Sequence, residues 1–315
     1  MPRVIPPTTR SLLVLEMAAE LTLAAAPAPV RQAKAVVDLG GGREIALLGS
    51  STIAGIHAVA AREVALAIVN PSATLTLAYR GNGPFPAPLP LRTIAVLPSR
   101  DQYVFAVHPQ TGLRSFAEIA AKRSRLRIGV RGDRAHSLHF MLDDIMRTSG
   151  FRREDITAWG GEFRFEGVAP DAGAPKFRAF LDGSLDAIFD EGADSWIGAA
   201  LDAGMTVLSL AEPALAQLEA LGYRRAIIPQ ARYPKLATDV LTVDFSGWPL
   251  FVHADSSDRD VTQICAALAG CVERIPWQED APLSLARMCR NAADAPYDVP
   301  LHPAAERSWM ERGIL

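Results

Sequence analysis

The stretch Leu126-Arg-Ile-Gly-Val130 lies between two segments that have the pattern of helices, residues 115–121 and 137–149. In such a setting, a short apolar run with β-branched residues predicts a strand. Outward from this stretch, short apolar runs alternate with longer amphipathic ones along most of the chain. Helices that cover both faces of a sheet produce this pattern, so the sequence predicts an α/β fold.

The length of 315 residues suits two lobes better than one small core. We assign residues 43–125 and 240–315 to the first lobe, residues 126–239 to the second, and residues 1–42 to an N-terminal helix and linker. Two chain crossings then form a hinge. The expected strands are 44–48, 66–69, 93–97 and 104–107 in the first lobe, and 126–130, 186–189 and 205–210 in the second. The expected helices are 52–63 and 71–79 in the first lobe, 137–149 and 194–203 in the second, and 257–274 and 302–312 after the chain returns.

Composition excludes several classes of function. The formal net charge is −3, with 32 Lys and Arg scattered among 35 acids, whereas a nucleic-acid binder needs a basic stripe. Cys265, Cys271 and Cys289 have no paired spacing, which argues against a disulfide framework or a zinc site. No Walker loop, GxGxxG, GxSxG or HExxH motif occurs. We therefore expect no nucleic-acid partner, no cofactor and no metal.

The N-terminus has two interpretations. Arg3 and Arg10 precede an apolar run, residues 12–26, which resembles a signal peptide. Glu16 and Glu20 interrupt that run at the i,i+4 spacing of the polar face of an amphipathic helix. We favour a retained helix, which implies a cytoplasmic protein; a degenerate signal would imply a periplasmic one.

Polar residues follow the first two expected strands. In doubly wound sheets, ligands bind beyond the carboxyl ends of strands, where helix N-termini present free N–H groups. Ser50, Ser51 and Thr52 follow the first strand, and Asn70 and Ser72 follow the second. These side chains are candidates to hold a carboxylate, and the alternative is that they only cap the next helix.

In the second lobe, charged and polar residues likewise follow two of the expected strands. Arg131, Arg134, His136 and Ser137 form the loop after the strand 126–130, where an arginine is suited to pair with a carboxylate. Asp190 and Glu191 follow the strand 186–189 and would receive an ammonium or hydroxyl group, or cap the next helix. Trp196 and Phe245 would wall the cleft or belong to the core.

Several motifs, taken in order, resemble a known family. They are the paired strands 91–97 and 103–107, the segment 111–119, the strand 127–130, the turn 181–188 and the C-terminal Val299-Pro-Leu-His-Pro-Ala-Ala-Glu306. Over residues 43–315 the chain resembles the solute receptors of TRAP transporters of the TAXI subclass, which end with a closely similar motif. The loop 131–137 departs from the Ser-Gly-Thr type of turn that is common in that family, which leaves the ligand open.

This resemblance implies a two-lobed type 2 periplasmic-binding-protein fold with a ligand cleft between two doubly wound domains. It also implies a small organic acid as ligand, such as an amino acid or dicarboxylate, and a TRAP membrane permease as partner, in uptake or sensing. The alternative function is a cytoplasmic enzyme on the same fold, such as a decarboxylase or lyase of an aromatic or dicarboxylic acid, with His57 or His136 as its acid or base.

Overall fold

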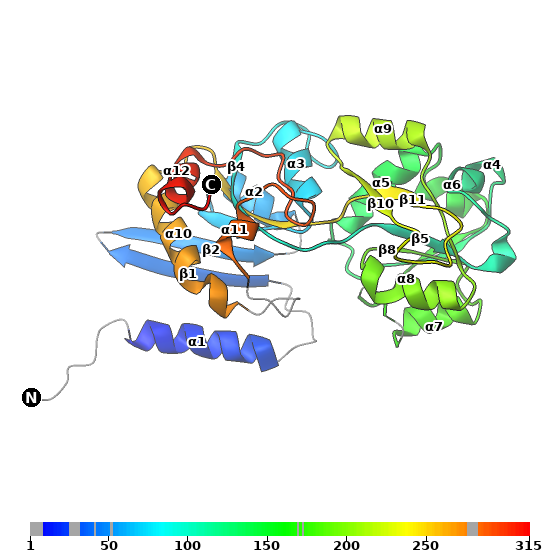
Figure 1. Ribbon diagram of the computed structural model, residues 1–315, viewed down its shortest axis with the longest axis horizontal. Coiled ribbons are helices and arrows are strands. Elements are labelled where there is room, and N and C mark those ends of the chain that lie inside the picture. Colours follow the sequence, from blue (N-terminus) through cyan, green and yellow to red (C-terminus); the bar gives the residue numbers. More distant parts are fainter. Residues whose placement is uncertain are drawn as a thin grey trace, which may run out of the picture.

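A computed structural model describes residues 9–24, 32–40, 42–50, 53–168, 170–171, 173–275 and 283–315 of the chain. Figure 1 shows two α/β lobes side by side along the long axis of the molecule. Each lobe is built on a five-stranded sheet of mixed direction. The predicted α/β fold with two lobes is confirmed.

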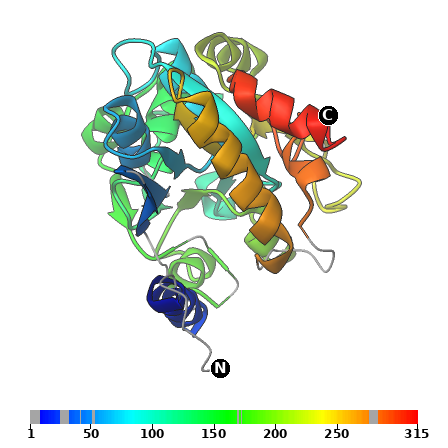
Figure 2. The same ribbon diagram turned by 90° about the vertical axis from the view of Figure 1, so that its left-hand side faces the viewer.

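The first sheet has the strand order β1-β2-β3-β12-β4. Its strands β2 and β3 are parallel, whereas β12 is antiparallel to both β3 and β4. Apolar residues on its two faces contact different helices, and in Figure 2 α10 and α12 lie together on one side of the lobe. The strands are β1 (Gln32–Gly40), β2 (Arg43–Ser50), β3 (Leu66–Ile68), β4 (Leu91–Leu97) and β12 (Trp248–His253). The helices are α2 (Ala54–Ala60), α3 (Ser72–Arg80), α10 (Asp258–Cys271), α11 (Leu285–Met288) and α12 (Pro303–Glu311), with a 3₁₀ turn at Val272–Arg274.

The second sheet has the order β7-β6-β8-β5-β9. Strand β6 is parallel to its neighbours β7 and β8, and β5 is antiparallel to the central strand β8 and to β9. The strands are β5 (Val104–Val107), β6 (Arg127–Val130), β7 (Glu162–Phe165), β8 (Ala187–Asp190) and β9 (Thr206–Val207), and a separate hairpin pairs β10 (Arg225–Ile228) with β11 (Val240–Val243). The helices are α4 (Ala117–Ala121), α5 (Leu138–Thr148), α6 (Arg153–Ala158), α7 (Pro175–Leu181), α8 (Ala193–Asp202) and α9 (Glu212–Leu221), with a 3₁₀ turn at Pro109–Thr111.

Strand β5 shows how both faces of this sheet are buried. Phe105 and Val107 belong to the cluster that includes α5, and Val104 and Ala106 belong to the cluster that includes α7 and α8. Successive side chains of a strand point to opposite faces, so a strand between two helical layers is apolar at every position. All four of these residues are fully buried.

Two strands lie in a different lobe from the one we expected. We placed 104–107 in the first lobe, but β5 pairs with β8 and β9 of the second sheet. We also began the returning part of the first lobe at residue 240, whereas β11 pairs with β10 beside the second sheet. A short, uniformly apolar run predicts a buried strand but carries no information on its pairing partner, which explains both differences.

The N-terminal part also differs from a helix followed by a linker. Helix α1 (Thr9–Ala24) is present, but strand β1 follows it and pairs with β2 along the edge of the first sheet. The apolar side chains of α1 are exposed, among them Val14 at 65% and Leu21 at 68%. Among the described helices, none combines the length and the hydropathy needed to cross a membrane.

The two crossings between the lobes, residues 98–103 and 244–247, run side by side. The Tyr103 N–H donates to the carbonyl of Val243, and the Phe245 N–H donates to that of Asp101. The Gly247 N–H donates to the Ser99 carbonyl at 2.8 Å. The two crossings therefore form a short antiparallel ladder, which lies where the sequence predicted the hinge.

Candidate functional site

A cluster of buried charges lies where two parallel strands of the second lobe end. Arg131 follows β6, and Asp190 and Glu191 lie at the end of the neighbouring strand β8. Arg131 Nη2 donates to Asp190 Oδ1 at 2.9 Å and to Glu191 Oε1 at 2.5 Å. The structure thus brings together three of the residues that the sequence singled out, because parallel neighbours end at the same edge of a sheet.

Lys176 completes this group, which we call the charge cluster: Arg131, Lys176, Asp190 and Glu191. Lys176 Nζ donates to Asp190 Oδ2 at 2.5 Å, and its side chain is 2% exposed. Its stem crosses β6 at Gly129, where an added Cβ would meet Lys176 Cγ at 3.2 Å. Sequence reasoning missed Lys176, since it lies within an apolar helical segment; the only signal was the glycine in the facing strand.

His136 and Ser137 lie beside the charge cluster. His136 Nε2 is 3.8 Å from Glu191 Oε1, and the imidazole stacks on Phe245 with an interplanar angle of 8°. Burial, reinforced by the charge of Arg131, lowers the pKa of His136 to about 3, so the ring is neutral at pH 7. Because Phe245 belongs to the second crossing, the site adjoins the hinge.

Burial governs the protonation of the acids at this edge. It raises the pKa of Glu191 to about 8, and the charges of Asp101 and Asp190 add to this effect while Arg131 opposes it. Burial likewise raises the pKa of Asp101 to about 7, although Asp101 accepts from the N–H groups of Gly192 and Ala193. We had not singled out Asp101, which reaches the start of α8 from the first crossing.

Both lobes contain buried polar atoms that have no hydrogen-bond partner in the described part of the chain. Arg131 Nε, Ser137 Oγ and Glu191 Oε2 are buried and have no hydrogen-bond partner among the described residues. In the first lobe the same holds for Asn70 Oδ1 and Ser72 Oγ, and also for Thr74 Oγ1, which sequence reasoning missed. Buried polar groups in native proteins are nearly always paired, so a set of exceptions needs an explanation.

These polar groups of the first lobe and those of the second lobe both lie near the second crossing. The Ser72 N–H donates to the carbonyl of Ser246 at 3.2 Å, and the neighbouring Phe245 contacts His136. The start of α3 and the loop before α5 therefore flank the same crossing. We refer to these polar groups of both lobes, together with the charge cluster, as the interlobe site.

Four candidates are not part of the interlobe site as described. Ser51 and Thr52 lie outside the described residues, and of Ser50 only the backbone is described, as the last residue of β2. Arg134 is exposed, and its guanidinium lies 3.6 Å from the centre of the Phe165 ring instead of joining Arg131. Within the described part of the chain, no group of His, Cys, Asp and Glu is suited to hold a metal ion.

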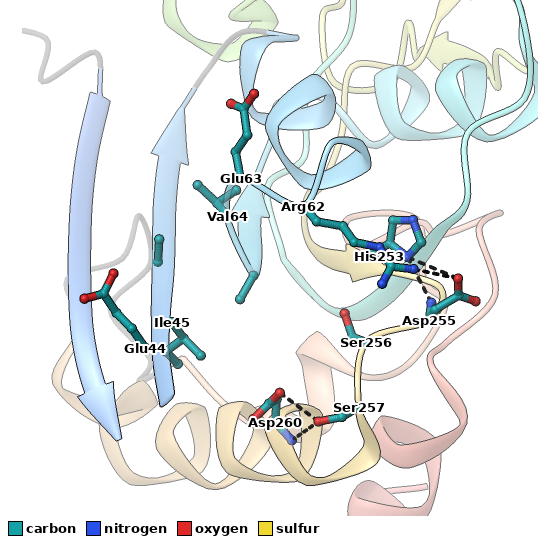
Figure 3. Close-up of a pocket in the computed structure, with 12 residues that line it drawn as sticks. Glu44, Ile45, Arg62, Glu63, Val64, His253, Asp255, Ser256, Ser257 and Asp260 are labelled. Carbon is teal, nitrogen blue, oxygen red and sulfur yellow. Dashed lines mark hydrogen bonds and ion pairs between the residues drawn. The ribbon is translucent and has the colours of Figure 1, made fainter. Parts of the chain in front are cut away.

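A surface pocket of about 310 Å³ lies on the first lobe, between β2, the end of α2 and the start of α10. Figure 3 shows the side chain of Arg62 directed toward His253 and Asp255 at one wall. Arg62 Nη2 is 2.7 Å from Asp255 Oδ2, and Ser257 Oγ donates to Asp260 at 2.7 Å. Because the Arg62–Asp255 ion pair at its wall is exposed to solvent, we place the candidate site at the interlobe site instead.

Comparison with known proteins gave one family and a set of remote structures. The NMT1-like family matches residues 43–313. The alkanesulfonate-binding protein SsuA from Xanthomonas axonopodis pv. citri, bound to MOPS, is 18% identical, with 70% of this chain and 60% of that chain covered and a TM-score of 0.33. A TctC solute-binding protein from Polaromonas is 18% identical, with 65% and 63% covered and a TM-score of 0.33.

A third similar structure is the regulatory domain of OxyR2 from Vibrio vulnificus, which is 10% identical, with 68% of this chain and 76% of that chain covered and a TM-score of 0.35. The match with SsuA and with the TctC protein spans less than two thirds of their lengths. No curated protein matched the sequence.

Proposed function

We propose a function for this chain, which belongs to the NMT1-like family: it is a solute-binding protein that closes its two lobes around a small organic anion. The observation that carries the proposal is the free Nε–H of Arg131, a buried cationic donor with no partner among the described residues. Leaving a buried donor unpaired costs about 1–3 kcal/mol, and a ligand carboxylate would remove that cost.

The first lobe supports closure around the ligand. Ser72 Oγ and Thr74 Oγ1, at the start of α3, are buried and, like Ser137 Oγ in the second lobe, have no hydrogen-bond partner among the described residues. A ligand that satisfies groups from both lobes stabilises the closed arrangement over the open one, and this difference in affinity is the source of a hinge motion.

The finer assignment follows from the resemblance to TAXI receptors. It supports a carboxylate as the anion, a TRAP permease as the membrane partner, and uptake or sensing as the role. The C-terminal residues 299–306 carry most of this likeness. Binding of the purified chain to membranes that contain a TRAP permease, compared with membranes without one, tests the partner separately from the ligand.

The enzyme alternative draws less support from the two histidines named for it. His57 is exposed and contacts Phe85 with a ring distance of 5.6 Å. His136 Nδ1 accepts from the Leu138 N–H at 3.3 Å, and in a neutral ring the proton is then on Nε2. With its lone pair occupied and its pKa lowered to about 3, His136 is a poor general base.

The test is a panel of six acids: L-glutamate, L-glutamine, succinate, 2-oxoglutarate, benzoate and phthalate. Thermal unfolding of the full chain is measured with each acid, and every compound that stabilises the chain is recovered and identified. An acid at 100 times its dissociation constant adds about 2.7 kcal/mol to stability. A compound recovered unchanged supports a binding protein, and a compound that is consumed indicates the enzyme alternative.

Variants then locate the site. Ser137→Ala and Ser72→Ala remove hydroxyls that have no partner in the described protein, and Ser149→Ala does the same at the end of α5 as a matched control. We expect the first two to weaken binding about tenfold, the value of one hydrogen bond to a charged group, and the control to change nothing. Equal affinities in all three variants would place the ligand elsewhere.

A further inference from the structure

When both acids are ionised, the charges of the charge cluster balance without a ligand. Lys176 and Arg131 face Asp190 and Glu191, and all four side chains are at least nine-tenths buried. Two cations thus meet two carboxyl groups. An anion that binds to Arg131 adds a negative charge that nothing in this cluster compensates, and an uncompensated buried charge is strongly unfavourable.

The two acids are not equivalent. Asp190 receives a bond from Lys176 on one oxygen and a bond from Arg131 on the other. Among the described residues, only Arg131 donates a hydrogen bond to the Glu191 carboxyl group, at Oε1. Its Oε2 is buried and has no partner among those residues. Glu191 is therefore the acid whose charge the protein compensates least.

Protonation of Glu191 would solve both problems at once. It removes one negative charge from the cluster, and it turns Oε2 from an unpaired acceptor into an O–H donor. Arg131 Nε, Ser137 Oγ and Glu191 Oε2 would then be three donors for one carboxylate, none of which has a partner within the described part of the protein. We propose that the interlobe site binds its anion together with one proton, which is held on Glu191; this inference rests on the proposed function.

Other titratable groups are less suited to carry the proton. Asp101 accepts from the backbone N–H groups of Gly192, Ala193 and Gln102, which favour its ionised form. His136 is held neutral by burial and by Arg131. The raised pKa of Glu191, about 8 before any ligand is added, fits the assignment. The other charged and titratable groups around the site are Asp101, Tyr103, Arg131, Asp133, His136, His139, Asp143, Arg153, Glu166, Lys176, Asp190 and Asp194.

The pH dependence of affinity follows. If only the form with protonated Glu191 binds, affinity is nearly constant below a pH of about 8 and falls about tenfold for each pH unit above it. Between pH 7 and pH 9 we expect about tenfold weaker binding. Proton uptake on binding should rise from about 0.1 to about 0.9 over the same range.

Calorimetry with the same six acids at pH 7 and pH 9 tests the inference, each in two buffers of different ionisation enthalpy to count protons. In the Glu191→Gln variant, whose neutral amide mimics the protonated acid, affinity at pH 9 should equal affinity at pH 7, with no proton uptake. Asp101→Asn is the matched control: it should keep proton uptake on binding, and the loss of affinity should begin at a lower pH, because the charge of Asp101 helps to raise the pKa of Glu191.

The possible outcomes separate failure of this inference from failure of the proposed function. Binding by the wild-type chain without proton uptake at pH 9 would overturn the inference and leave the proposed function standing. Loss of all binding in Glu191→Gln at pH 7, in a variant that unfolds at the wild-type temperature, would show that an ionised Glu191 holds a cationic group of the ligand, which also overturns it. If none of the six acids binds the wild-type chain at either pH, the proposed function itself fails.

Discussion

Gln102 and Asp244 face each other in an antiparallel bridge, one on each of the two crossings between the lobes. The crossings are therefore not independent tethers, because they share backbone hydrogen bonds along their length. Any rotation of one lobe against the other must be absorbed by φ and ψ changes at the ends of this ladder. Residues that fix those ends should control both stability and ligand closure.

Gly247 lies at one end of this ladder. Its φ is +76°, and an added Cβ would lie 2.7 Å from Ser72 Oγ and 2.8 Å from Pro296 Cδ. Gly112 has a φ of +64° but nothing within 4 Å of an added Cβ. We expect Gly112→Ala to lower the free energy of unfolding by about 1–2 kcal/mol through backbone strain alone. Gly247→Ala should cost about 1–3 kcal/mol more through crowding. Urea unfolding of both variants measures the difference, and equal losses would contradict this assignment.

Ser246 joins the two crossings through its side chain. Its hydroxyl accepts from the Asp101 N–H at 3.0 Å and donates to Asp244 Oδ1 at 2.6 Å. Ser246→Ala leaves a buried N–H unpaired, which should lower the free energy of unfolding by about 1–3 kcal/mol. Ser149→Ala, at a hydroxyl without a partner among the described residues, should cost less than 1 kcal/mol by the same measurement. A smaller loss at Ser246 than at Ser149 would show that the hydroxyl does not hold the ladder.

Stability should fall as pH rises from 7 to 8.5. Glu191 and Asp101 have pKa values raised by burial to about 8 and about 7, so the folded chain binds more protons than the unfolded chain over this range. Their stabilising contribution is complete below their unfolded pKa values and is lost as pH rises through the folded ones. Glu191→Gln should make the decline shallower, as measured by urea unfolding at several pH values. An identical slope in the variant would mean that Glu191 does not titrate there.

Asn82 connects the first lobe to α9, since its Nδ2 donates to the Leu221 carbonyl at 2.6 Å. Helix α9 packs on α5 of the second lobe, so this bond holds the lobes together. Under the proposed function this bond stabilises the closed arrangement, so Asn82→Ala should weaken ligand binding by several-fold without touching the ligand. Gln230→Ala removes a similar amide-to-carbonyl bond, to Leu236, without joining the lobes. In calorimetry this control should bind as tightly as the wild-type chain.

The local sequence pattern predicted some of the charged residues of the interlobe site but not others. Arg131 was expected near Asp190 and Glu191 because each lies just after an apolar run, and parallel strands end at a common edge. Their contacts in the structure agree with that reasoning. Lys176 and Asp101 were not expected, since Lys176 lies in the first turn of helix α7 and Asp101 in a chain crossing. Nothing in their local sequence marks them as members of the site.

The sequence by itself determined the alternation of strands and helices, the two-lobed α/β fold and the polar residues at the strand ends, because periodicity and side-chain chemistry are local properties. Only the tertiary structure decided that β5 joins the second sheet, that Lys176 pairs with Asp190, and that Glu191 Oε2 has no partner among the described residues. These outcomes depend on which surfaces meet when residues far apart in the chain are packed together, and burial then sets the charge that each group carries.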